Sequence, residues 1–283
     1  MSADEVGLRV ERAWAATSVA HAEALARADA TWGTDVFPVA DGWAVLCGPG
    51  LFVNRVLAAG LAAPLAPAEL DRFETRAGAA GVLPAFEVSE LTRPDWTDEL
   101  ARRGYTADGS VTALARPLAE PAGTIHGAVV VEQLASDRVA EWQELSALGW
   151  GITVPAARRA SDAFAVAAAA AGQSLLVARD ADDGRPLGCA VLIVHDGVAT
   201  LGGMSTLPTG RRRGVQSTLV TERLAIAYRA GCDLAATSAV TGGDSERNLE
   251  RLGFTPTHTK RTLVLLPVVS TSSTTWSVPA SGG

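Results

Sequence analysis

Lysine, cysteine and aromatic residues are scarce in this chain of 283 residues. Lys260 is the single lysine among 24 basic residues, a bias that we attribute to a GC-rich genome rather than to a mechanism. The three cysteines, Cys47, Cys189 and Cys232, are isolated in apolar stretches, which excludes a disulfide-stapled scaffold. Together with the four scattered histidines they show no metal-ligand spacing, so we expect no metal.

Long apolar runs and an excess of positive charge are also lacking. No window of about 18 residues is free of polar groups, so we expect no membrane span. The acidic start at residues 1–5 lacks the basic and apolar parts of a secretory signal, which favours a cytoplasmic protein. The formal net charge of −7 argues against broad binding to nucleic acid or anionic membranes and is compatible with an amine substrate.

A hydrophobic content of 48% predicts a folded chain, and at about 150 residues per domain the length predicts two domains. Hydrophobic periodicity and turn signals divide the first half into helices over residues 5–29, 67–80 and 94–103 and strands over 42–47, 84–89 and 110–116. After a Pro- and Gly-bearing linker at 117–124, they predict strands over 127–134, 174–179, 187–194, 198–204, 233–240 and 262–266, and helices over 136–149, 154–172, 213–230 and 245–252.

The two halves resemble each other in sequence. Arg76-Ala-Gly78 parallels Arg229-Ala-Gly231, and the segment 99–105 parallels 248–254, in the same order. Several ordered matches indicate a duplicated fold. We therefore predict an α+β protein with tandem copies at 1–118 and 124–267, each a mixed, mostly antiparallel sheet flanked by helices, and a flexible tail at 268–283.

The most informative segment is residues 205–217, which lies between a predicted strand and a long amphipathic helix. A Gly- and Arg-containing turn at the start of a helix presents free backbone N–H groups and a positive dipole end, which suit a phosphate. Gly214 allows close approach of the backbone, and Arg211, Arg212 and Arg213 supply charge. Read without its context, the same segment is equally a basic loop that caps a helix.

The segment 208–216 resembles the pyrophosphate-binding signature of the GNAT superfamily of acyl-CoA N-acyltransferases, with Arg211, Gly214 and Gln216 on its marked positions. A short helix that ends in Gly-Phe about 40 residues later is a second hallmark of that family, and the segment 245–254 fits it. The order of predicted elements over 124–267 is also that of the family.

The resemblance implies binding of acetyl-CoA without a metal, with the pyrophosphate on the amides of residues 212–217. The pantetheine arm would run along Met204–Leu207, and a backbone N–H near Thr206 would polarise the thioester carbonyl. Ser245 and Asn248 are candidate contacts to the CoA arm, or alternatively a helix cap and a surface amide. The cofactor-binding set is thus Met204, Thr206, Leu207, Arg211, Arg212, Arg213, Gly214, Val215, Gln216, Ser217, Ser245 and Asn248.

Three positions depart from the family pattern. Gln216 stands where a small residue is usual, so its side chain must turn away from the phosphate or bond to it. Leu249 stands where many members carry a general-acid tyrosine, and the strand 198–206 contains no Glu or Asp to act as a base. The catalytic candidates are therefore weak: Glu87 or His126 as a base, and Trp150 as a wall of the acceptor pocket or as a core residue.

The first half has no Arg-x-x-Gly, and Glu69 at its equivalent helix start would repel phosphate, so we expect no CoA there. We expect it to support the second half and to form a wall of the acceptor site, with residues 48–55 either in that wall or as a plain turn. The resemblance implies an N-acetyltransferase, monomer or homodimer, that transfers acetyl from acetyl-CoA to a small-molecule amine by direct attack in a ternary complex. Alternatives are transfer of a longer acyl group or to a protein N-terminus, and a non-catalytic acyl-CoA sensor.

Overall fold

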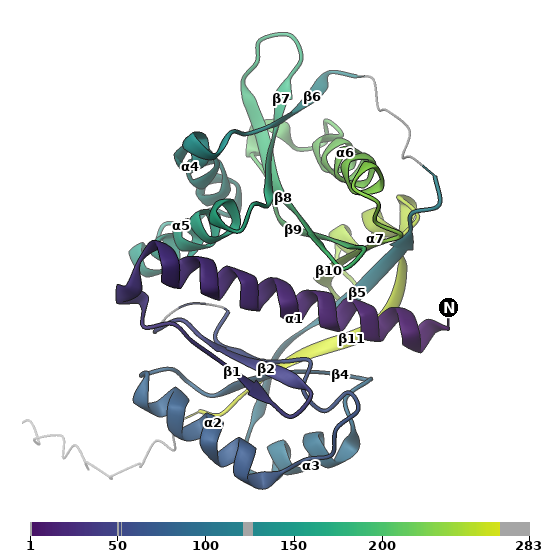
Figure 1. Ribbon diagram of the computed structural model, residues 1–283. Coiled ribbons are helices and arrows are strands. Elements are labelled where there is room, and N and C mark those ends of the chain that lie inside the picture. The colour runs from purple at the N-terminus through teal and green to yellow at the C-terminus, as the bar shows by residue number, and fades with distance from the viewer. Residues whose placement is uncertain (1, 50, 52, 121–126, 267–283) are drawn as a thin grey trace, which may run out of the picture.

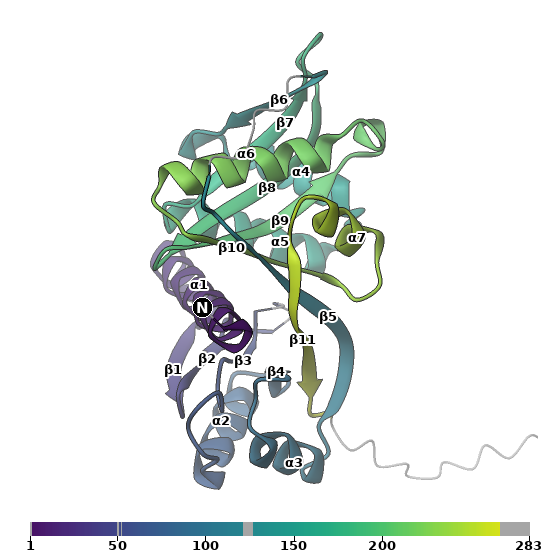
Figure 2. The same cartoon turned by 90° about the vertical axis from the view of Figure 1, so that its right-hand side faces the viewer.

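The computed structural model of the chain describes residues 2–49, 51, 53–120 and 127–266. His126 and the predicted tail at 268–283 lie outside these residues. The described strands form one continuous sheet (Figures 1 and 2). In spatial order its strands are β1 (Asp35–Val39), β2 (Gly42–Leu46), β3 (Arg55–Leu57), β4 (Ala85–Ser89), β11 (Thr255–Val264), β5 (Thr106–Pro117), β10 (Leu234–Val240), β9 (Val198–Thr206), β8 (Pro186–His195), β7 (Ser174–Asp180) and β6 (Val129–Gln133).

Helices cover both faces of this sheet (Figures 1 and 2). Helix α1 crosses the middle of the molecule beside α4 and α5, whereas α6 and α7 lie on the other face. The helices span α1 (Ala3–Ala28), α2 (Pro67–Ala79), α3 (Pro94–Arg102), α4 (Val139–Trp150), α5 (Pro155–Ala170), α6 (Val215–Arg229) and α7 (Asp244–Arg251), with short 3₁₀ turns at Ala30–Trp32, Ser136–Arg138 and Pro208–Gly210.

The predicted α+β class is confirmed, and the predicted helices and strands are found with shifts of a few residues at most of their ends. Two strands were not predicted. β1 contains Pro38, which only an edge strand tolerates readily, and β3 has three residues, too few for a periodic signal. β11 begins seven residues before the predicted start at residue 262. The prediction missed these residues because Pro256 and His258 interrupt the apolar pattern of the strand.

The last strand of each half lies among the strands of the other half. β5 pairs antiparallel with β10 and β11 of the second half, and β11 pairs antiparallel with β4 of the first half. The predicted division at residues 118–124 stays a prediction, because the sheet runs through both halves without a break.

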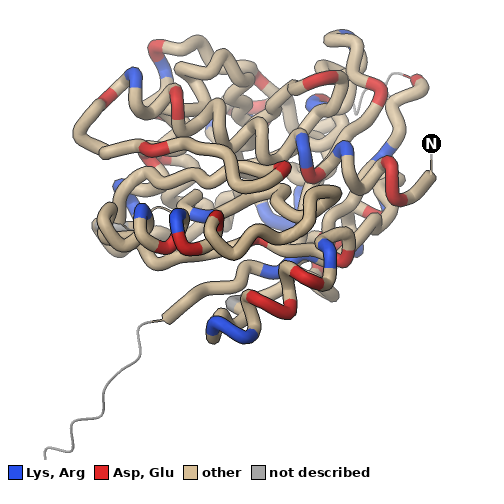
Figure 3. Tube along the Cα trace, turned by 60° about the horizontal axis from the view of Figure 1, so that its bottom comes forward, with Lys and Arg blue, Asp and Glu red and all other residues tan. Residues whose placement is uncertain are grey.

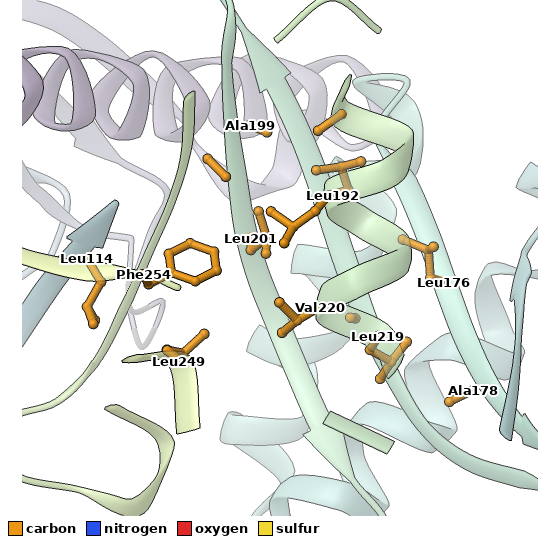
Figure 4. Close-up of a cluster of buried hydrophobic side chains, with 14 of the residues drawn as sticks. Leu114, Leu176, Ala178, Leu192, Ala199, Leu201, Leu219, Val220, Leu249 and Phe254 are labelled. Carbon is orange, nitrogen blue, oxygen red and sulfur yellow. The ribbon is translucent and has the colours of Figure 1, made fainter. Parts of the chain in front are cut away.

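The exchanged strands carry core residues with them. Leu114 of β5 packs in the same buried cluster as Leu201, Leu249 and Phe254 of the second half (Figure 4). A second buried cluster surrounds Phe86 of β4 in the first half. The core of the second half is therefore completed by a side chain from the first.

Acidic and basic residues are interspersed along the chain (Figure 3), and pairs such as Glu99 with Arg102 lie at the surface. Lys260, the single lysine, is instead buried within β11. Its Nζ atom lies 3.0 Å from Glu11 Oε1 on α1 and 2.5 Å from Glu87 Oε1 on β4. The His258 Nε2 atom lies 2.9 Å from the same Glu11 oxygen. One ammonium group thus joins α1, β4 and β11.

Glu11 and Lys260 hold each other in their charged forms. Burial alone would raise the pKa of Glu11, but Lys260 and His258 outweigh burial and hold that pKa below its ordinary value. Burial likewise opposes the charge of Lys260, while Glu87 and Glu11 hold its pKa above the ordinary value. A carboxylate whose pKa is lowered by folding stabilises the fold above its unfolded pKa and loses this effect as the pH falls through the folded pKa.

We predict that Lys260→Met lowers the free energy of unfolding by about 3–5 kcal/mol at neutral pH, because Glu11 and Glu87 lose their shared buried cation and keep only His258 and Arg55 as partners. The loss should shrink as the pH falls from 7 to about 4, because burial raises the pKa of Glu11 once Lys260 is gone, so that Glu11 becomes protonated in the folded variant at a higher pH than in the wild type. Urea unfolding across this pH range measures both effects. The control is Arg229→Met, which removes an exposed cation paired with Glu222. A Lys260→Met protein as stable as the control would contradict this account.

Candidate active site

The parallel strands β9 and β10 separate part-way along their length. They pair only from Val198 opposite Leu234 to Thr200 opposite Ala236. Beyond this point β10 continues along β5, and Thr237 Oγ1 donates to the Leu201 carbonyl at 2.9 Å. Residues 202–206 of β9 therefore present a free backbone edge to the gap between the two strands.

A bulge in β9 lies at the start of this free edge. The register with β8 shifts between Ser205 opposite Cys189 and Gly202 opposite Val191. Gly203 has φ +53°, and a Cβ atom there would lie 3.2 Å from the Phe164 ring. Both the backbone conformation and the close packing thus require glycine at this position.

Arg223 of α6 holds the bulge from the face of the sheet opposite to α4 and α5. Its Nη1 atom donates to the carbonyl of Val191 at 3.2 Å and to that of Gly202 at 3.3 Å. The side chain is fully buried, and no carboxylate among the described residues forms an ion pair with it. Burial lowers the pKa of Arg223 to about 9, which leaves the guanidinium charged at neutral pH.

The predicted phosphate-binding turn follows the free edge directly. Gly214, with φ +77°, precedes α6 without a side-chain cap, and Arg212 also has a positive φ, +59°. Within the described chain, the first turn of α6 has backbone N–H groups without intrahelical partners, as in any helix start. Arg211 and Arg212 are exposed and have no recorded ion-pair partner there, whereas Arg213 donates to Asp180 at 2.8 Å. Arg211 and Arg212 are thus the cations available to a ligand, and Arg213 anchors the turn to β7.

The side chains around this turn form hydrogen bonds among themselves. Gln216 turns sideways, and its Nε2 atom donates to Ser245 Oγ of α7 at 3.1 Å. Asn248 Oδ1 accepts from Arg251 at 3.3 Å at the surface. Leu249 is buried in the core beside Phe254 and carries no hydroxyl (Figure 4).

Of the remaining predicted CoA contacts, Met204 and Thr206 lie at the end of β9 and Leu207 directly follows it, whereas Val215 and Ser217 lie in the first turn of α6, where the Val215 side chain is buried. The Leu207 N–H donates to the Leu187 carbonyl of β8 at 2.9 Å. Because N–H groups alternate in direction along a strand, the Thr206 N–H turns toward the free edge. This is the orientation that an added strand-like ligand needs.

A cavity of about 570 Å³ lies beside the bulge, between α1, α4, α5 and β9. Its lining includes Trp150 and also residues of the first half: four from α1 and Val53 from the segment 48–55. The lining residues are Trp14, Thr17, Ser18, His21, Val53, Trp142, Ser146, Trp150, Ile152, Ala157, Ala160, Ser161, Phe164, Ile193, Gly202 and Gly203.

Glu87, the other catalytic candidate, does not line this cavity. Its carboxylate contacts Lys260 and, at 3.3 Å, Arg55. We therefore interpret Glu87 as the counter-ion of Lys260 rather than as a base. Sequence reasoning overlooked Thr17 and His21, whose only signal is their spacing of four residues in a predicted helix, which places them on one face.

No group of three or more His, Cys, Asp or Glu residues arranged to hold a metal ion occurs in the described part of the chain. None of its helices is both long and apolar enough to cross a membrane.

Comparisons with known proteins agree with this geometry. The model of the acetyltransferase (GNAT) family matches residues 139–254, from the start of α4 to the residue before β11. No curated protein sequence matches the chain.

Solved structures match most of the chain. A GCN5-related N-acetyltransferase from Kribbella flavida is similar at a TM-score of 0.64 and 20% identity, over 88% of this chain and 94% of that one. A GCN5-related N-acetyltransferase from Sphaerobacter thermophilus matches at 0.55 and 16%, over 70% and 65%. A tandem GNAT protein from the clavulanic acid biosynthesis pathway matches at 0.55 and 13%, over 70% and 69%.

Residues 139–254 therefore form a GNAT-family acetyltransferase domain, within a chain that has the GNAT fold over most of its length. The family is one of acyltransferases, and the structure supports acyl transfer as the general class of activity.

We predict that Arg223→Met increases backbone hydrogen exchange at residues 201–205, because the carbonyls of Val191 and Gly202 lose their buried donor. Arg229→Met on the same helix removes an exposed arginine and is the matched control. Hydrogen exchange read by mass spectrometry compares the two variants with the wild type. Unchanged protection of residues 201–205 in Arg223→Met would show that Arg223 does not hold the bulge.

Proposed function

We propose that this protein is an acetyl-CoA-dependent N-acetyltransferase that acts on a small-molecule amine by direct attack. The observation that carries the proposal is a continuous arrangement: the turn before α6, the free edge of β9 and the cavity beside Gly203 follow one another in space. A donor that carries phosphates at one end and a thioester at the other fits this order.

The pyrophosphate would bind the backbone N–H groups of residues 212–217, with Arg211 and Arg212 adding charge. The side chain of Gln216 leaves space for it, because it is turned toward Ser245. In this proposal Ser245 and Asn248 would lie beside the donor rather than under the pyrophosphate.

The pantetheine arm would pair with the free edge of β9 at Thr206 and bring the thioester to the bulge. There the cavity begins at Gly202 and Gly203. A backbone N–H of the bulge would polarise the carbonyl, and the buried charge of Arg223 would stabilise negative charge that develops above it.

In the transfer step the amine nitrogen attacks the thioester carbonyl carbon and forms the C–N bond. The nitrogen loses a proton to water, the tetrahedral intermediate collapses, the C–S bond breaks and the CoA thiolate leaves. Leu249 has no proton to donate, so the thiolate is protonated from solvent. Much of the acceleration then comes from positioning of the two substrates.

We predict that a double change, Arg211→Gln with Arg212→Gln, weakens acetyl-CoA binding about tenfold or more, since two charge-assisted contacts to the phosphates are lost. Titration calorimetry measures the affinity at two salt concentrations, and the wild type should lose more affinity on added salt than the double variant. Arg229→Gln serves as the control. Equal affinity of the double variant and the wild type would contradict the assignment of the phosphate site.

A non-catalytic acyl-CoA sensor is the second candidate, because Leu249 replaces an acid and the described lining of the cavity contains no carboxylate. Release of free thiol from acetyl-CoA across an amine panel separates the two. We expect release that depends on both the amine and the protein. Binding of acetyl-CoA without release of free thiol in the presence of any amine would favour the sensor. Release of thiol only from longer acyl-CoA molecules would show that the donor is a longer acyl-CoA and not acetyl-CoA.

A further inference from the structure

Two polar side chains of α1, Thr17 and His21, lie one helical turn apart and both line the cavity. They belong to the first half of the chain, whereas the free edge of β9 belongs to the second. Neither is part of the motif by which acyl-CoA is bound.

The Thr17 hydroxyl lacks a partner. Thr17 is 5% exposed, and its Oγ1 atom has no hydrogen-bond partner among the described residues. An unpaired buried hydroxyl costs free energy. The atom is closed to solvent in this structure, but Thr17 itself lines the cavity, so rotation about χ1 lets a ligand bond to the hydroxyl and recover that cost. The neighbouring Ser18 differs, because its Oγ donates to the Trp14 carbonyl at 3.1 Å.

His21 is held in one orientation. Its Nε2 atom lies 2.7 Å from Gln173 Oε1, and its ring meets the Phe164 ring edge to face, 5.0 Å between centroids. A carbonyl oxygen can only accept, so Nε2 carries the proton and Nδ1 keeps a free lone pair. Phe164 also borders Gly203, so His21 and the bulge flank the same aromatic ring.

The rest of the cavity is apolar. Its walls are formed largely by the rings of Trp14, Trp142, Trp150 and Phe164, and none of its described lining residues is acidic or basic apart from His21. Such a cavity offers no carboxylate to pair with a further ammonium group on the acceptor, in addition to the amine that is acetylated. It suits an amine with an apolar or aromatic body.

We propose that Thr17 and His21 form the subsite for the acceptor nitrogen, and that the acceptor is an apolar primary amine. This inference rests on the proposed acetyl transfer. After rotation about χ1, Thr17 Oγ1 accepts one N–H of the neutral amine and orients its lone pair toward the thioester at Gly203. As the C–N bond forms, the proton leaves the nitrogen and reaches His21 Nδ1 through water in the cavity, because the Phe164 ring lies between His21 and the bulge, and it passes to solvent after CoA has left.

The surroundings of His21 are consistent with a single titrating base. A second, smaller cavity touches the other side of the ring, and its described lining adds one titratable group, the Cys47 thiol. Burial raises the pKa of Cys47 to about 11, so it stays neutral. Burial also lowers the pKa of His21, which keeps the ring neutral and able to accept a proton at pH 7.

Binding to the full chain tests the subsite without turnover. In the presence of saturating CoA, we expect calorimetry to detect benzylamine but not 1,4-diaminobutane. Thr17→Val should weaken benzylamine binding about fivefold or more, and CoA affinity in the same samples should stay within about twofold of the wild type. Thr75→Val is the matched control, because Thr75 is an exposed helix residue whose hydroxyl bonds to the Asp71 carbonyl.

Turnover tests the proton transfer. We expect His21→Asn to lower kcat for benzylamine about 100-fold or more with little change in the KM for acetyl-CoA. In the wild type, kcat should fall as the pH decreases through a pKa below about 6.5, where His21 becomes protonated. This fall should be absent from the pH profile of His21→Asn. His195→Asn, at an exposed histidine of β8, should behave as the wild type.

The outcomes separate the two proposals. If the wild type acetylates benzylamine and the Thr17 and His21 variants do so equally well, the subsite is wrong and acetyl transfer stands. If the wild type binds benzylamine through Thr17 but releases no thiol with any amine, acetyl transfer fails, and so does the role of His21. Equal or tighter binding of 1,4-diaminobutane would overturn the apolar acceptor.

Discussion

The ion pairs of Lys260 with Glu11 and Glu87 are the interaction on which the proposed site depends. They fix α1 to β11, the strand that the second half contributes to the first. Glu11, Trp14, Ser18 and His21 follow one another along one face of α1. Lys260 Nζ also lies 5.1 Å from the Trp14 ring, which lines the cavity. The charge that anchors the helix therefore also sets the position of the cavity wall.

The exchange of β5 and β11 explains why both halves are needed for one site. The second half supplies the free edge of β9, the bulge and the turn before α6. The first half supplies α1, which covers that edge, and the strand β5 that draws β10 away from β9. In the proposed function, the first half would thus form the other wall of the acceptor cavity.

Local signals in the sequence were sufficient to predict the turn that precedes α6, because a turn and a helix start depend on neighbouring residues. The assignment of that turn as a phosphate site stays a prediction. The partners of Glu87 could not be predicted, since Lys260 reaches it only through the pairing of β4 with β11. Thr17 and His21 were missed for the same reason: a helical pattern identifies a buried face but not what that face meets. Their significance appears only when α1 lies against α5.

The most direct test is a crystal structure of the full chain with a bisubstrate analogue, in which CoA is joined through an acetyl linker to the nitrogen of benzylamine. The account predicts the pyrophosphate on the amides of residues 212–217, the linker at Gly203, and the benzyl group between α1 and α5 with its nitrogen facing Thr17 and His21. A benzyl group outside the cavity covered by α1, with CoA in the same place, would contradict an acceptor site shared between the two halves.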